Sequence, residues 1–396
     1  MRKLWLIPLA AILFLAGAVL AETQTQELAA SPGEKLVFDL DSGGDIEVTG
    51  WDRDGASVTT ETSGRDAGKV RVDVSRTADG IRITSPRMDR GDRADLRIRV
   101  QVPKRFDVEL NTAGGDVRLE GLEGAFEGET MGGDVDLLSL DGEASVKTMG
   151  GDVSVRASRL DGKVSTMGGD VELDDVDGNL DASTMGGDIT ERNVRRSGGR
   201  GAEAVTVSSY GGDVQVDTAP AGANVKTMGG DISVRSVGEF LTAVTMGGDV
   251  EVDEATGKTE ITTMGGDITV GSFDGEIAAK TMGGDVELDV VGTSAPGGHD
   301  VDLSSMGGDL LLTLPADFSG RFEIKLVKLR KRPDDARIES DFPLDVKEPA
   351  EWTTSSGSGG RYGGDHKIIT ATGTTGGGDH LVKLETVNGL IRIKRR

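Results

Sequence analysis

Eleven aspartates follow a Gly-Gly pair at nearly constant spacing, and their carboxylates are the first groups in this sequence that could do chemistry. They recur with an 18-residue period within two runs of five, and one more follows; in order they are Asp116, Asp134, Asp152, Asp170, Asp188, Asp213, Asp231, Asp249, Asp267, Asp285 and Asp309. If the repeats stack, neighbouring carboxylates lie about 4.8 Å apart and repel one another. Bonds from turn amides, cations held between repeats, or side chains splayed into solvent would relieve that repulsion.

Calcium is the cofactor that such a column would take, because stacked Gly- and Asp-rich turns bind it in β-rolls. The candidate ligands are Asp134, Asp152, Asp170, Asp231, Asp249 and Asp267. Calcium prefers six to eight oxygens, and one aspartate per repeat supplies few. Aspartate also favours turns because its side chain bonds nearby backbone, while glycine adopts positive φ. We therefore favour a structural role with no cofactor, and keep calcium as the alternative.

A methionine precedes the Gly-Gly pair in most repeats, and Tyr210 takes its place once. Thioethers bind soft metals, but methionine more often fills irregular gaps in a core. We therefore interpret these methionines as packing at a corner of each repeat. The preceding threonine, as in Thr148, Thr166 and Thr184, predicts a ladder of hydroxyls rather than a catalytic array.

Catalytic groups are scarce in the rest of the chain. It has no cysteine, and its three histidines, His299, His366 and His380, each adjoin an aspartate in glycine-rich segments typical of surface loops. No phosphate-binding glycine loop ends in lysine. Some β-helix proteins cleave acidic polysaccharides, so a lyase or hydrolase stays open as an alternative, although aromatic residues make up only 4% of this chain. The sequence favours a protein that is not an enzyme.

The repeated aspartates, methionines and threonines lie at the ends of short β-strands or between them. In one repeat Val171 and Leu173 alternate with Glu172 before a turn, and Leu180, Ala182 and Thr184 alternate on the way back. An 18-residue repeat that contains a Gly-Gly pair leaves no room for long helices. Crossovers between parallel strands are nearly always right-handed. We predict an all-β fold, a right-handed parallel β-helix (β-solenoid) of 18-residue, two-strand rungs with irregular β caps at both ends.

The sequence divides into four parts. Residues 1–21 resemble a signal peptide, with Arg2 and Lys3 before an apolar run and small residues at its end; an uncleaved membrane anchor is the alternative. Residues 22–110 predict an N-terminal β cap, residues 111–314 the solenoid repeats and residues 315–396 a C-terminal β cap. Two longer intervals between aspartates place extruded loops near residues 195–201 and 292–299.

Several segments resemble the exported bacterial proteins known as the putative-adhesin family, a domain of unknown function with a β-helix and repeated Gly-Asp-Val turns. The resemblance covers most of the mature chain. It rests on the turns themselves and on three further segments: Ser42–Val48 with Gly50-Trp51-Asp52, Val102-Pro103, and Val387–Ile393. The repeats here are more regular than in that family. The resemblance implies a right-handed β-helix outside the cytoplasm, and it implies no catalytic residue.

The resulting hypothesis is a non-enzymatic protein of the periplasm, outer envelope or cell surface that acts as an adhesin-like binding or scaffolding rod. A net charge of −24 opposes nucleic acid and anionic lipid, so the expected partner is an envelope or surface protein or glycan. Membrane contact is expected only through an uncleaved signal segment. The preferred contact site is the basic insertion near residues 195–201, through Arg195, Arg196 and Arg200.

Overall fold

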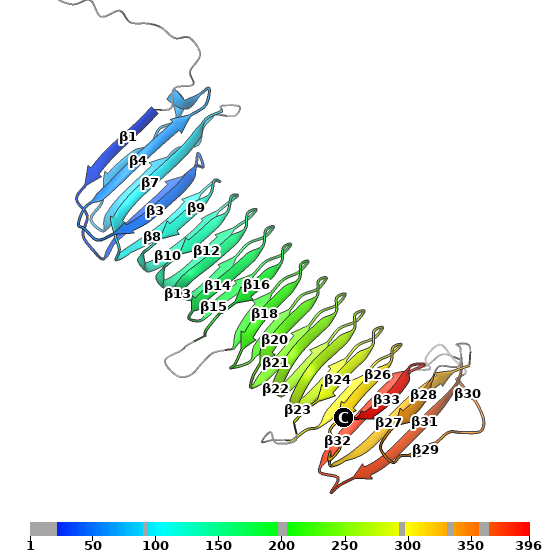
Figure 1. The fold of residues 1–396 in the computed structure, drawn as a ribbon. Helices are drawn as coiled ribbons and strands as arrows, with labels where there is room; N and C mark the ends of the chain where they lie inside the picture. Colours follow the sequence, from blue (N-terminus) through cyan, green and yellow to red (C-terminus); the bar gives the residue numbers. More distant parts are fainter. Residues whose placement is uncertain (1–21, 90–92, 197–203, 293–297, 331–335, 356–363) are drawn as a thin grey trace, which may run out of the picture.

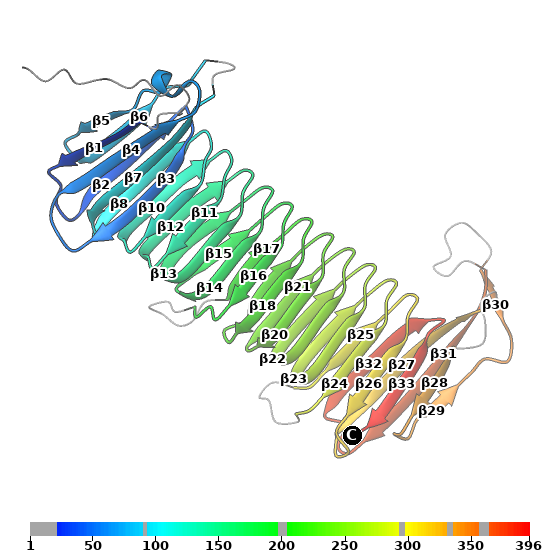
Figure 2. The same ribbon diagram turned by 45° about the horizontal axis from the view of Figure 1, so that its top comes forward.

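The computed structural model describes residues 22–89, 93–196, 204–292, 298–330, 336–355 and 364–396. The chain is all-β: a long rod of stacked strands with a broader cap at each end (Figures 1 and 2). In the described residues the only helical element is a short 3-10 turn, Ala67–Lys69, and no described helix is long and apolar enough to cross a membrane. The predicted signal peptide, residues 1–21, lies outside the described residues.

The rod consists of strands β9 to β26, which build its two sheets, and the three 13-residue strands among them contribute to both sheets. Their bounds are β9 (Val117–Glu120), β10 (Glu123–Thr130), β11 (Val135–Leu138), β12 (Asp141–Thr148), β13 (Val153–Ser165), β14 (Val171–Asp177), β15 (Leu180–Ser183), β16 (Ile189–Arg192), β17 (Val205–Ser208), β18 (Val214–Ala219), β19 (Ala223–Lys226), β20 (Ile232–Val237), β21 (Phe240–Val244), β22 (Val250–Thr262), β23 (Ile268–Lys280), β24 (Val286–Val290), β25 (Val301–Ser304) and β26 (Leu310–Leu314). Neighbouring strands pair in parallel, and Val135 lies beside Val153, its equivalent in the next repeat. We call each such turn of the chain a rung.

Side-chain alternation places the core between the two sheets. Val171 and Leu173 are buried while Glu172 faces outward, and Leu180 and Ala182 are buried on the way back, as predicted. One continuous hydrophobic cluster runs from Ala30 to Ile393, through the rod and both caps. Because each rung is narrow, aliphatic side chains from the two sheets fill the interior.

The two long intervals leave the strand pairing intact. Across the first, which separates Asp188 from Asp213, Ile189 pairs with Val214. Across the second, Val286 pairs with Leu310. The additional residues therefore leave the rung between its two sheets, as expected from the spacing. Most of them, residues 197–203 and 293–297, lie outside the described residues.

The rod continues into both caps through segments far away in sequence. At the N-terminal end, Ile46 pairs with Val117, so the early turn Ser42–Asp45 stacks on the turn Ala113–Asp116. At the C-terminal end, Leu310 pairs with Ile391, which belongs to the last strand of the chain. The sequence predicted irregular caps here, yet each cap contributes a rung to the stack.

The caps close the rod with mixed sheets. The N-terminal cap contains β1 (Glu22–Leu28), β2 (Glu34–Leu40), β3 (Asp45–Trp51), β4 (Ala56–Ser63), β5 (Asp73–Arg76), β6 (Gly80–Ser85), β7 (Asp95–Pro103) and β8 (Phe106–Thr112). The C-terminal cap contains β27 (Gly320–Leu329), β28 (Arg337–Ser340), β29 (Asp345–Lys347), β30 (Thr353–Ser355), β31 (Gly364–Thr375), β32 (His380–Val387) and β33 (Leu390–Arg395). Antiparallel strands, such as β4 on β7 and β31 on β27, end the parallel stack. Such ends protect strand edges from pairing with other chains.

Candidate functional site

The turn that contains Met-Gly-Gly-Asp, which we call the repeat corner, stacks directly from rung to rung. Its buried threonine or serine donates a hydroxyl hydrogen bond to the second glycine carbonyl of the preceding rung, at 2.7–3.0 Å from Thr148 to Thr386. The same hydroxyl accepts amide hydrogen bonds from its own turn, as Thr166 does from Gly168 and Gly169. The predicted ladder therefore joins hydroxyls to backbone rather than to one another.

The aspartates form a second ladder in the repeat corner. The backbone amide of each aspartate donates to Oδ1 of the aspartate one rung earlier, for example Asp134 to Asp116 at 2.9 Å. This pattern runs without a break from Asp45 to Asp309, which accepts from the amide of Leu390 at 2.7 Å. Of the three arrangements that could relieve the repulsion, the structure shows bonds from turn amides.

The second residue of each Gly-Gly pair must be glycine because the backbone of the preceding rung lies too close for a Cβ atom. A Cβ built on Gly169 would lie 2.3 Å from the carbonyl oxygen of Gly151 and 2.3 Å from Oδ1 of Asp152. On Gly168, the first glycine, a Cβ would lie 3.4 Å from its nearest neighbour. Neither residue has the positive φ that we expected from glycine in these turns. Packing between rungs, rather than a left-handed backbone, therefore explains the Gly-Gly pair in the central rungs.

The six aspartates considered as calcium ligands all belong to this ladder. Each uses Oδ1 to accept an amide of the next rung, and each side chain is exposed. Among the described residues, no three His, Cys, Asp or Glu side chains converge closely enough to hold a metal ion. A calcium site would therefore have to combine their second carboxylate oxygens with ligands from outside this ladder, and calcium binding stays a prediction.

The methionines of the repeat corner are exposed, which corrects the prediction that they fill gaps in the core. Their exposed fractions run from 38% at Met149 to 57% at Met131, and Tyr210 is 59% exposed. Together they form one row along the rod, which we call the methionine row: Met131, Met149, Met167, Met185, Tyr210, Met228, Met246, Met264, Met282 and Met306. Beyond the row, the exposed large hydrophobic side chains among the described residues are Val291 and Val346.

The arginines of the predicted basic contact site differ in their exposure. Arg195 is exposed and pairs with Asp175 and Asp177, whereas Arg200 lies outside the described residues. The Arg196 side chain is only 3% exposed and pairs with Glu191 at 3.0 Å. Arg196 therefore cannot present its guanidinium to a partner, which corrects that part of the prediction.

Arg196 is buried because Glu191 occupies an interior position of its rung. Glu191 lies between Leu173 and Val216 in the sheet, where the neighbouring rungs place aliphatic side chains. Burial raises the pKa of Glu191 to about 7, and the charge of Arg196 opposes that rise. Glu191 Oε2 has no hydrogen-bond partner among the described residues. An alignment of the rungs alone could have shown this charged residue in an aliphatic column.

Two histidines expected in surface loops are buried instead. His299 is 1% exposed, and its Nε2 lies 2.6 Å from Asp274 Oδ1. His380, 81 residues away, accepts a hydrogen bond from the His299 amide at its Nδ1, at 3.2 Å. His366 is also buried. His299 and His380 meet at the junction between the rod and the C-terminal cap, where β32 adds to the stack, whereas His366 lies within the cap, in β31.

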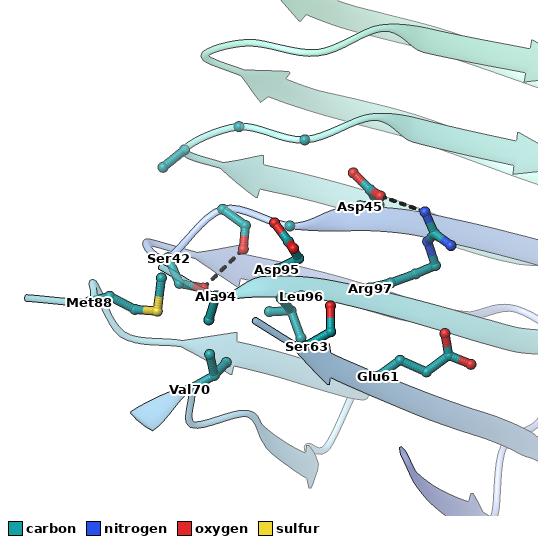
Figure 3. Close-up of a pocket in the computed structure, with 15 residues that line it drawn as sticks. Ser42, Asp45, Glu61, Ser63, Val70, Met88, Ala94, Asp95, Leu96 and Arg97 are labelled. Atoms are coloured by element: carbon teal, nitrogen blue, oxygen red, sulfur yellow. Dashed lines mark hydrogen bonds and ion pairs between the residues drawn. The ribbon is translucent and has the colours of Figure 1, made fainter. Parts of the chain in front are cut away.

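An open groove of about 580 Å³ lies where the N-terminal cap meets the first rungs (Figure 3). Asp45, Glu61 and Asp95 line it around Arg97, which pairs with Asp45 at 3.1 Å. Met88 and the glycine turns complete its wall. No pattern in the sequence indicated this groove, because its walls come from strands that are distant in the chain. It has polar walls of both charges, so it could admit a small polar molecule.

Three solved structures resemble the chain at low identity. They are a putative cell adhesion protein from Clostridium sporogenes (9% identity, 95% of this chain and 100% of that one, TM-score 0.19), a putative lipid binding protein from Parabacteroides distasonis (14%, 68% and 97%, 0.26) and a putative adhesin from Parabacteroides merdae (12%, 68% and 97%, 0.28). TM-scores this low carry no argument about what this chain binds. No curated protein matches it.

A family model, Toastrack DUF4097, matches residues 28–313. The match begins in the N-terminal cap and extends to β26, so it includes the early Ser42–Asp45 turn and all the regular repeats. The match confirms the resemblance to a family whose domain is of unknown function. The chain therefore belongs to the Toastrack DUF4097 family.

Proposed function

We propose that this protein is an exported, non-enzymatic rod that binds or scaffolds other molecules in the cell envelope or at the cell surface, as an adhesin does. One observation carries the proposal: the polar groups that recur in every rung are bonded within the fold, while long charged sheet faces stay exposed. The Asp and Thr ladders fix successive rungs to one another. Twelve steps of the Asp ladder make the rod about 58 Å long, at about 4.8 Å per rung. A stiff, regular surface suits binding better than catalysis.

The contact surface that we propose is a group of acidic residues on the sheet that contains β22 and β24. Glu251, Asp253, Glu254 and Glu287 are exposed, and none has an ion-pair partner among the described residues. The N-terminal rungs differ, since Asp136 pairs with Arg118 and Arg156 of the two adjacent rungs, both at 2.7 Å. We call the four unpaired residues the acidic face. Their charge suits a basic protein or glycan and opposes nucleic acid.

We also propose that the protein is exported and that its rod is right-handed, because crossovers between parallel strands are nearly always right-handed. The apolar segment within residues 1–21 supports export. Protease treatment of intact cells and of cells with a permeabilised outer layer, followed by immunoblotting, tests the location. Digestion in intact cells would place the rod at the surface, and digestion only after permeabilisation would place it in the periplasm. Recovery of the protein in the cytoplasmic fraction would overturn the proposal.

Binding is tested with the labelled mature chain and isolated envelopes of the parent organism. We expect saturable binding that weakens as salt rises, because charges at the surface are screened. Replacing the acidic face with Gln or Asn (E251Q, D253N, E254Q and E287Q together) should weaken binding at least tenfold. The matched control neutralises four exposed carboxylates elsewhere on the rod: E123Q, E127Q, E129Q and E143Q. Equal loss in both variants would reduce the effect to net charge, and no saturable binding would overturn the proposed function.

A further inference from the structure

The methionine row concentrates one kind of side chain in one place. The chain has 11 methionines, and all but Met1 and Met88 stand at the same position of the repeat corner, before the Gly-Gly pair. They remain 38–57% exposed. Leucine or valine would serve equally well if this position needed only an apolar side chain. An exposed apolar row along a rod is also a liability for association. The property that sets methionine apart is its thioether sulfur.

The rungs hold neighbouring methionines at a fixed separation. The amide of Met149 donates to the carbonyl of Thr130 at 3.1 Å, and paired strands precede and follow the corner in register, at Thr130 with Thr148 and Val135 with Val153. Neighbouring methionines therefore start from backbone positions about 4.8 Å apart. The zinc–cysteine bond, about 2.3 Å long, sets the scale of a metal–sulfur bond, so two opposite bonds span about 4.6 Å. The two lengths agree.

We propose that the methionine row binds soft monovalent cations, copper(I) or its analogue silver(I), between the thioethers of adjacent rungs. Thioether ligands select copper(I) over hard cations such as calcium and magnesium. The Asp ladder runs three residues beyond the row and keeps one carboxylate oxygen of each residue outside the ladder bond, so its charge raises the local concentration of cations. No electron transfer is involved, since the cation binds and leaves in the same oxidation state.

Tyr210 divides the row and so sets how many cations it can hold. Four methionines precede it, from Met131 to Met185, and five follow it, from Met228 to Met306. If each methionine takes part in one pair, each run holds about two cations, which gives about four per chain. Replacing Tyr210 with methionine would join the two runs into ten consecutive thioethers and raise the capacity to about five. This inference goes beyond the proposed function, because it needs no macromolecular partner.

The experiment uses the purified mature chain with silver(I) in chloride-free buffer, and copper(I) without oxygen as a second probe. Calorimetric titration, with metal analysis after gel filtration, should find about four ions per chain in the natural protein and about five in Y210M. Replacing all nine methionines of the row with leucine should abolish this binding and leave the circular dichroism unchanged. The matched control is M88L, which removes a thioether outside the row and should retain about four ions. X-ray absorption should show sulfur neighbours at about 2.3 Å for copper(I).

Binding that survives the nine leucine substitutions, or light-atom neighbours in place of sulfur, would overturn the proposal. An unchanged capacity in Y210M would also contradict it, because pairing along the row requires that capacity to rise. If the leucine variant does not fold, single leucine substitutions at Met167 and Met246 decide, since each leaves one adjacent pair in its run and should reduce the capacity by about one ion. Loss of envelope binding in the acidic-face variant with normal silver binding would separate this inference from the proposed function.

Discussion

The repeat corner and the opposite edge of the rod solve the same problem, a tight turn between two sheets, in different ways. From Thr148 onward, every rung uses the same three devices in the corner: a hydroxyl ladder, an aspartate ladder and a glycine without room for a Cβ. At the opposite edge the turns differ in length, and both insertions leave the rod there. Four rungs place a non-glycine residue at positive φ, at Ser139, Ala157, Asp175 and Asn193, and the described turns of later rungs do not.

The comparison shows where the chain is free to change. The corner repeats because each turn bonds to the next, so an altered residue would disturb the turns on both sides. Among the described residues of the opposite edge no ladder runs the length of the rod, and a loop or a buried ion pair such as Glu191–Arg196 fits without breaking the stack. The repeated residues therefore stabilise the fold, whereas the residues that depart from the repeat are the ones that can give this chain features of its own.

The largest effect should come from overfilling the corner. Gly169→Ala places a Cβ 2.3 Å from the backbone of the preceding rung, so the rungs must separate, and we expect a loss of about 3 kcal/mol or more in unfolding free energy. Gly168→Ala is the matched control, since its nearest neighbour lies at 3.4 Å, and it should cost less than about 1 kcal/mol. Urea unfolding measures both. Similar losses in the two variants would refute the explanation by close approach.

The next effect tests the opposite edge by pH. Burial raises the pKa of Glu191 from 4.5 to about 7, so between these values the folded chain retains a proton that the unfolded chain has lost. Stability should therefore fall as pH rises from 5 to 8, by about 3 kcal/mol. Glu191→Gln cannot titrate and should flatten this dependence, as seen in melting temperatures across the range. A natural protein and variant with parallel pH profiles would contradict the assignment.

A smaller loss should follow from removing one hydroxyl of the corner. Thr166→Val keeps the shape but leaves the Gly151 carbonyl and two glycine amides without this partner, which should cost about 2 kcal/mol. Thr166→Ser keeps the hydroxyl and imitates Ser209 and Ser305, which occupy the same position in other rungs. We expect the serine variant to unfold close to the natural protein in urea. If serine proves as damaging as valine, lost packing rather than the hydroxyl explains the position.

The smallest effect should be a gain at the opposite edge. Ala157 has a φ of 49°, a conformation that asparagine tolerates better than alanine. Ala157→Asn should therefore stabilise the rod by less than about 1 kcal/mol, measured as a small rise in melting temperature. Ala182→Asn, which would place an amide in the core, should have the opposite sign. Destabilisation by Ala157→Asn would show that the turn depends on more than its backbone angle.

Periodicity made most of the rod predictable. The 18-residue spacing of the aspartates gives the strand register, and alternation at Val171 and Leu173 gives the buried face. The same alternation could not predict that the methionines are exposed, because each methionine lies where a strand meets a turn and the alternation of buried and exposed residues ends. The burial of Arg196 depends on Glu191, which stands out only when rungs are aligned. The contact between His299 and His380 joins segments 81 residues apart, and no local pattern reports it.

The account rests on the claim that the corner aspartates serve as acceptors for the backbone, and one measurement tests it directly: the melting temperatures of the natural protein, Asp170→Asn and Asp170→Ala, each in chelator and in millimolar calcium. Asparagine keeps an oxygen that can accept the Asp188 amide, so its melting temperature should match or exceed the natural one, whereas alanine should lose about 1 kcal/mol. None of the three should respond to calcium. A natural protein that melts higher in calcium, with that increase lost in Asp170→Asn, would contradict the account.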